Sequence, residues 1–150
     1  MRVATLTLCL GLLGCASEIP EVELGTGVHR FESLEDGAAL PMAMGAQGGF
    51  HLWLAVRVRG VALEGLEVSL VAAPVARTRP RQDLRLMPRM EPSDGWATAS
   101  GVPFVLSTAE CFRDRDVRIE LEVRDREGLA LRDARTVRPT WPTPIGACVP

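Results

Sequence analysis

The chain has 150 residues, of which 47% are hydrophobic, and its formal net charge at pH 7 is -2. All of its 17 basic residues are arginine, a bias that a GC-rich genome explains. Because acidic groups slightly outnumber basic ones, no overall positive field attracts nucleic acid, and we expect no nucleic-acid partner. The length suits one domain with a sizeable core.

The N-terminal segment has the pattern of a secretion signal. Arg2 precedes an apolar run from Val3 to Leu13. A membrane-spanning helix needs about 20 apolar residues, so this run is too short to span a bilayer. We therefore predict that residues 1–14 are a signal peptide that is removed from the mature protein.

The end of this signal resembles the lipobox of bacterial lipoproteins. Leu12 lies three residues before the predicted cleavage point, Gly14 just before it and Cys15 just after it. The resemblance implies that Cys15 carries acyl chains and anchors the protein in a lipid membrane. In Gram-negative families, a residue such as Ala16 after the cysteine implies the outer membrane, facing the periplasm or the cell surface. Ordinary secretory cleavage after Ala16 is the alternative.

The next segment has the composition of a linker. Residues 16–27 contain three glutamates, a proline and two glycines, which disfavour regular structure. Their negative charge would hold a domain off an anionic lipid surface. We predict that residues 15–27 are the lipidated cysteine and an acidic spacer, and that residues 28–150 are the folded domain.

Alternation of apolar and polar residues predicts β-strands throughout this domain. A period of two places one set of side chains in a core and the other toward solvent. For example, Leu52 and Leu54 alternate with His51 and Trp53. The segments with this period are 50–58, 66–70, 84–86, 102–106 and 117–123.

Turn-forming sequences rich in glycine and aspartate separate the predicted strands. They are 35–37, 45–49, 60–65, 93–95 and 125–128. Seven or eight short strands at this spacing, without a convincing helical pattern in the mature chain, predict an all-β fold. The expected architecture is an antiparallel, immunoglobulin-like β-sandwich.

Residues 31–60 are similar to part of some uncharacterised predicted lipoproteins with immunoglobulin-like β-sandwich domains. The resemblance rests on Glu35-Asp36-Gly37, Pro41 and the run Gly45-Ala46-Gln47-Gly48-Gly49-Phe50-His51-Leu52-Trp53. It implies an architecture and no activity, because those families have none assigned. The resemblance does not include the Cys-Trp-Cys order of true immunoglobulin domains, since Trp53 precedes both Cys111 and Cys148.

The four cysteines have three predicted roles. Cys9 leaves with the signal, Cys15 is acylated, and Cys111 and Cys148 remain. In the oxidising compartment of an exported protein, a disulfide is the usual fate of such a pair. Two buried free thiols or a metal-bound pair are the alternatives, although no neighbouring histidine or cysteine gives a zinc-like spacing.

His51, Trp53 and Arg57 are predicted to lie on the side of their strand that faces away from the core. Aromatic residues and arginine are enriched at binding hot spots, so this side is the candidate interaction surface for an envelope protein or a glycan. The alternative is that the spacer or a neighbouring loop covers it.

A metal site is a weaker candidate. Met42 and Met44 alternate onto one predicted strand face, and His29 and His51 are near in sequence. Thioether and imidazole groups suit Cu(I), while packing in the core is the alternative role of the methionines.

A basic stretch could bind an anionic partner through arginine, whose planar group matches phosphate and carboxylate. It consists of Arg77, Arg79, Arg81, Arg85 and Arg89. The alternative is a solvated strand in which Leu84 and Leu86 point inward.

Catalytic motifs are lacking: the sequence has two histidines, no Gly-x-Ser-x-Gly, no His-Glu-x-x-His and no phosphate loop. We therefore expect no enzyme, no metal and no cofactor. The sequence favours a membrane-anchored envelope lipoprotein that acts as a non-enzymatic binding or interaction module. Structural support of an envelope assembly and a periplasmic copper-binding protein are the alternatives.

Overall fold

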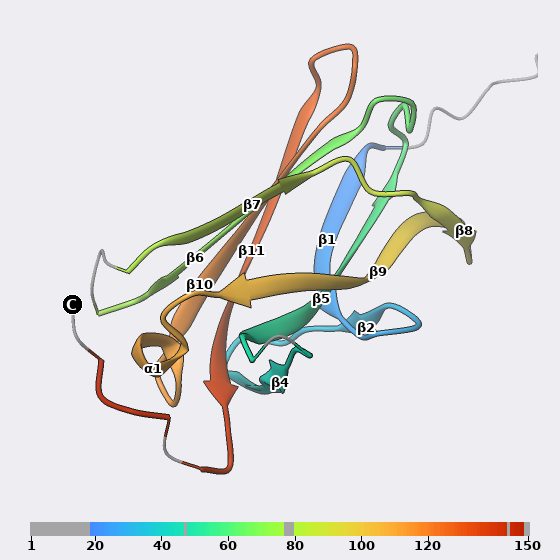
Figure 1. The fold of residues 1–150 in the computed structure, drawn as a ribbon. Coiled ribbons are helices and arrows are strands. Elements are labelled where there is room, and N and C mark those ends of the chain that lie inside the picture. Colours follow the sequence, from blue (N-terminus) through green and yellow to red (C-terminus); the bar gives the residue numbers. More distant parts are fainter. Residues whose placement is uncertain (1–18, 47, 77–79, 144, 149–150) are drawn as a thin grey trace, which may run out of the picture.

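Two β-sheets pack face to face in the computed structural model, which describes residues 19–46, 48–76, 80–143 and 145–148 (Figure 1). The first sheet has the order β2-β1-β5-β9-β8, with β4 paired to β5 beside this row, and the second has the order β3-β11-β10-β6-β7. The strands of the first sheet are β1 (Glu21–Thr26), β2 (Glu32–Ser33), β4 (Ala43–Met44), β5 (Phe50–Arg59), β8 (Glu91–Ser93) and β9 (Trp96–Leu106). Those of the second are β3 (Ala38–Pro41), β6 (Glu67–Pro74), β7 (Gln82–Leu86), β10 (Val117–Arg124) and β11 (Ala130–Thr140).

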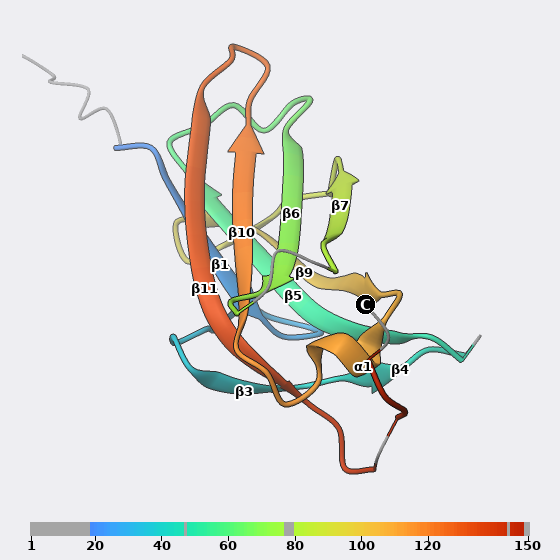
Figure 2. The ribbon, with the colours of Figure 1, turned by 90° about the vertical axis from the view of Figure 1, so that its left-hand side faces the viewer.

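The order of the strands is that of an immunoglobulin-like sandwich. In such a fold, strands A, B, E and D form one sheet and strands C, F and G form the other. Here β1, β5, β9 and β8 take the first four places, and β6, β10 and β11 take the other three. β7 lies beside β6 at the edge of the second sheet (Figure 2). The predicted all-β sandwich is confirmed.

The period of two in the sequence decides which side chains form the core. Along β5 and β10, alternate apolar residues are buried between the sheets, while the charged residues between them face outward. The core residues at these alternate positions are each 0–1% exposed: Leu52, Leu54, Val56, Val58, Val117, Ile119, Leu121 and Val123. One cluster of contacts joins them with residues of the other strands.

The prediction of a spacer is wrong for Glu21–Thr26, because these residues form β1. Leu24 is 1% exposed in the core, whereas Glu21 and Glu23 point outward and form ion pairs with arginines of β5. The acidic residues therefore stabilise a strand pair across the sheet instead of solvating a linker. The β-structure begins by Glu21 and not at residue 28. Residues 1–14 and Cys15 lie outside the described part of the chain.

Three further features differ from the prediction. The described residues form eleven strands instead of seven or eight, and two of them, β2 and β4, have only two residues each. β3 pairs with β11 in parallel, whereas periodicity indicates only burial and not the partner of a strand. Helix α1 (Ala109–Phe112) is a single turn, too short to give a helical pattern. Within the described ranges, no helix has the length and hydrophobicity to cross a membrane.

The predicted turn at 93–95 is confirmed as a tight hairpin between β8 and β9. Ser93 pairs with Trp96, so Asp94 and Gly95 are the two turn residues. Their φ angles are 49° and 78°. Two positive values are typical of a type I′ turn, whose twist matches that of the flanking strands.

Candidate functional site

His51 and Trp53 form an aromatic pair on the outer side of β5. Their ring centroids are 4.5 Å apart and their planes meet at 86°, an edge-to-face arrangement. Both side chains are half-buried, and Nε2 of His51 is buried without a hydrogen bond to any described residue. The hydroxyl of Thr26 donates a hydrogen bond of 2.6 Å to the backbone carbonyl of Trp53. This bond ties the end of β1 to the strand that carries the pair.

Trp53 also lines a groove of about 680 Å³ beside β5. The remaining lining comes from the turn after β1, from β2 and from the segment 38–43. The buried side chains of Leu34 and Met42 belong to this lining, while His29 and Arg30 are exposed at it. Apolar walls with a few polar groups are typical of small binding sites.

The turn after β1 packs against β9 through a close contact between the two backbones. The amide of Gly101 donates a hydrogen bond of 2.9 Å to the carbonyl of Gly27. At Gly101, φ is +68°, and an added Cβ would lie 2.6 Å from the carbonyl oxygen of Val28. Glycine adopts this conformation at no steric cost, and its lack of a side chain permits this approach. Ala55, next to the register shift between β5 and β9, is fully buried although it lies on the outer side of β5.

Arg57 belongs to a separate arrangement of rings and charges. Its guanidinium carbon lies 4.2 Å from the centroid of Phe31 and 4.5 Å from that of Trp96. Its Nη2 lies 2.6 Å from a carboxylate oxygen of Glu23. Arg59 repeats the pattern, at 4.6 Å from Trp96. We call Phe31, Arg57, Trp96 and Glu23 the outer stack.

The structure therefore divides the three predicted surface residues. His51 and Trp53 lie together, and Trp53 lines the groove. Arg57 is held in the outer stack, with the buried Ala55 between Trp53 and Arg57 on the same side of the strand. The prediction missed Phe31, Trp96 and Glu23. The alternation of acidic and apolar residues in 21–24 was the signal that could have revealed Glu23 as a strand residue. A role of this side in binding stays a prediction.

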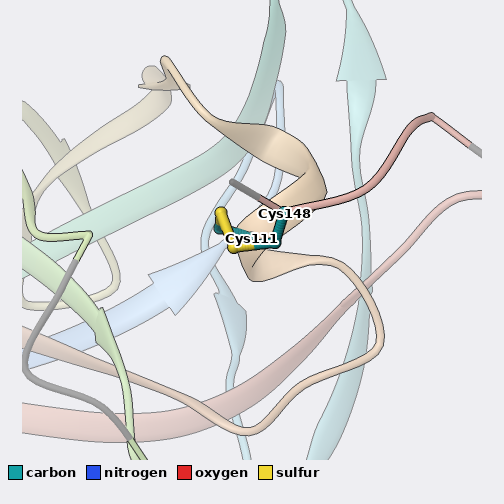
Figure 3. The surroundings of a disulfide bond; sticks show 2 residues. All are labelled: Cys111 and Cys148. Carbon is teal, nitrogen blue, oxygen red and sulfur yellow. A yellow bond between two sulfur atoms is a disulfide. The ribbon is translucent and has the colours of Figure 1, made fainter. Parts of the chain in front are cut away.

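The predicted disulfide between Cys111 and Cys148 is confirmed (Figure 3). Cys111 is buried on α1, Cys148 belongs to the C-terminal tail, and their Cα atoms are 4.6 Å apart. Trp141, where the tail begins, meets Phe50 at 5.0 Å in an edge-to-face contact. A disulfide that closes a loop of this length lowers the conformational entropy of the unfolded chain, and this stabilises the folded state by about 4 kcal/mol at most.

The fold separates the two methionines of the candidate copper site. Met42 is 4% exposed and Met44 is 57% exposed, so the two thioethers do not share a face as predicted. Met42 points into the core because it lies between β3 and β4, where the chain crosses from one sheet to the other. In the described part of the chain, no group of three or more His, Cys, Asp and Glu side chains could hold a metal ion.

The basic stretch is only partly described. Arg81 and Arg85 are exposed, and Leu84 and Leu86 pack against the core as predicted. Arg89 forms an ion pair with Glu91 at 2.9 Å. The remaining two arginines, Arg77 and Arg79, lie outside the described residues.

The chain matches no protein-family model and no curated protein sequence. The resemblance of residues 31–60 to predicted lipoproteins therefore stays a prediction. What is established is the class of fold, a two-sheet β-sandwich that carries a disulfide between Cys111 and Cys148.

Proposed function

We propose that the protein is a lipid-anchored lipoprotein of the cell envelope whose β-sandwich is a non-enzymatic binding module. The observation that carries the binding role is the groove in which the half-buried Trp53 meets apolar side chains. A tryptophan in this setting offers a large apolar surface to a side chain of a peptide or to a sugar ring. We expect the partner to be another envelope protein or a glycan.

The lipid anchor is tested independently of the groove. The expected acyl acceptor is Cys15, so cells that express the wild-type chain and grow with a labelled fatty acid should incorporate label into it. Cys15→Ala should abolish the label and leave the precursor uncleaved. Equal label in both chains would contradict the lipoprotein assignment without affecting the groove.

Binding at the groove is tested by photo-crosslinking in living cells. A photoreactive amino acid replaces Val28, an exposed apolar residue that lines the groove. Leu129 is the matched control, because it is 40% exposed against 44% for Val28 and does not line the groove. We expect a discrete adduct from position 28 and none from position 129. Digestion by protease or by glycosidases then distinguishes a protein from a glycan.

A second variant connects the adduct to the aromatic pair. Trp53→Ala, combined with the photoreactive residue at position 28, should reduce the adduct at least about tenfold if the ring is a binding hot spot. The absence of any adduct at position 28, or the same adduct from both positions, would contradict the proposed binding role.

A further inference from the structure

β7 is a free edge of the second sheet (Figure 2). One side of this strand pairs with β6 from Gln82 to Leu86. Over the described residues, no backbone-to-backbone hydrogen bond reaches β7 from a segment other than β6, and the one further contact of this kind is at its first residue, where the side-chain oxygen of Gln82 accepts a hydrogen bond of 3.2 Å from the amide of Ser107. At five residues it is longer than the other outermost strands of the two sheets, which have two, three and four. The unpaired backbone groups of an edge strand are a template for another strand.

The side chains of β7 form a short self-complementary pattern. Asp83 and Arg85 are exposed on the outer face, and neither forms an ion pair with a described residue. Between them, Leu84 is half-buried against the core, as is Leu86. When two such strands run antiparallel and Leu84 lies opposite Leu84, Asp83 of each strand lies opposite Arg85 of the other. The pattern is therefore complementary to itself.

We propose that β7 pairs with β7 of a second copy of this chain, antiparallel, about a twofold axis at Leu84. In this register, Asp83 of each copy lies opposite Arg85 of the other, so the ion pair forms twice. Leu84 meets its own counterpart on the core side. The contact is isologous, the usual form of a symmetric dimer, and joins two sheets into one.

The charges select this occupant and this register. A uniformly acidic peptide would be attracted by Arg85 but repelled by Asp83. Moving the twofold axis by one residue, to Asp83 or Arg85, sets that charge opposite itself, which is unfavourable in a strand pair. Moving it by half a residue places inward side chains opposite outward ones, which the burial of one face forbids. β7 itself carries the required sequence in the required direction.

The register is tested by cysteine trapping in two differently tagged full-length chains that are expressed together. One carries Asp83→Cys and the other Arg85→Cys. Residues directly opposite in an antiparallel pair have Cα atoms about 4.5–5.5 Å apart, within reach of a disulfide. We expect the mixed pair to form a linked dimer under mild oxidation. When both chains carry Asp83→Cys, the two cysteines lie two positions apart along the paired strands. This combination should therefore give about tenfold less linked dimer. Equal trapping in both combinations, or none, would overturn the proposal.

A charge exchange tests the same contact without new cysteines. We expect two tagged wild-type copies to purify together, and Asp83→Arg alone or Arg85→Asp alone to lose about tenfold or more of the second copy. A copy with Asp83→Arg mixed with a copy with Arg85→Asp should recover the association, because opposite charges again face each other. Glu120→Arg, on the outer face of β10, is the control and should have no effect. Single variants that associate like wild type, a mixture that fails to recover, or wild-type copies that do not purify together would each overturn the dimer, and none of these results depends on the lipid anchor.

Discussion

The guanidinium carbon of Arg57 lies 4.5 Å from the centre of the Trp96 ring. The two residues belong to neighbouring strands, β5 and β9, and Phe31 and Glu23 complete the outer stack from the N-terminal region. Charge and aromatic contacts therefore connect three parts of the chain on the side of the first sheet that faces away from the core. Arginine suits this place because its planar group stacks on rings while it binds a carboxylate.

Replacing Arg57 with lysine should separate stacking from charge. Lysine keeps the attraction to Glu23 but loses the planar contact with two rings, so we expect the free energy of unfolding to fall by about 1–2 kcal/mol. Arg118→Lys is the control, because the side chain of Arg118 is more than half exposed and, among the described residues, forms an ion pair only with Glu120. Its effect should stay within about 0.5 kcal/mol. Urea denaturation of both variants measures the difference, and equal losses would contradict a special role of the outer stack.

Trp53 and Leu54 are adjacent in β5 but face different surroundings, so their truncation should have different costs. Leu54 is fully buried, and Leu54→Ala should lower the free energy of unfolding by about 2–5 kcal/mol. Trp53 is half-buried at the groove. We expect Trp53→Ala to cost about 1–2 kcal/mol, because only part of the surface of the tryptophan side chain is buried in the fold. Thermal and urea unfolding compare the two. A loss at Trp53 as large as at Leu54 would make the tryptophan a core residue and remove the main support for the groove as a binding site.

Gly101→Ala should disturb the turn that forms one wall of the groove. The new methyl group meets the carbonyl of Val28 and the residue keeps a positive φ, so we expect a loss of about 3 kcal/mol or more. Gly37→Ala is a matched control, because Gly37 has a φ of +82° and open space around its missing Cβ. It should lose only about 1–2 kcal/mol from the backbone conformation. Similar melting temperatures for the two variants would show that the close contact at Val28 is unimportant.

Much of the sandwich could be predicted because its central strands are half-buried. In β5 and β10 the apolar residues occur at every second position, and each such position lies in the core. The disulfide could be predicted because the expected loss of Cys9 with a signal peptide and the expected acylation of Cys15 would leave Cys111 and Cys148 as a pair. β1 was missed because Glu21 and Glu23 share a short segment with glycine and proline, a composition that linkers also have.

The groove and the outer stack could not be read from the sequence, because both depend on contacts between distant segments. Val28 reaches β9 only because Gly101 interrupts the regular pairing, and periodicity does not show where a turn will settle. Phe31 meets Arg57 although 26 positions separate them in the printed sequence. In physical terms, period two identifies a buried face but not which loop covers the opposite face.

The acidic residue at the centre of the outer face of β10 gives a pH-dependent prediction. Hydrogen bonds from Arg132 and, next, from Arg124 lower the pKa of Glu122 below its usual value. A carboxyl group whose pKa is lowered by folding stabilises the folded state above its usual pKa, and this contribution is lost as the pH falls through the lowered value. We expect Arg132→Gln to raise the pKa of Glu122 toward its usual value, as measured by NMR titration of the carboxyl carbon. Arg118→Gln should leave it unchanged, because Arg118 contacts Glu120 instead.

The bond between Cys111 and Cys148 closes a covalent ring that contains all of β10 and β11. Tension applied to the chain beyond Cys148 passes through the two sulfur atoms to α1, and the strands inside the ring carry none of it. The cysteines are 37 positions apart, so at about 3.5 Å per residue roughly 130 Å of contour length is withheld from stretching. Held at its N-terminal end and pulled at its C-terminal end, the domain would extend as a shorter polymer than its sequence length implies, until a reductant releases the remaining length.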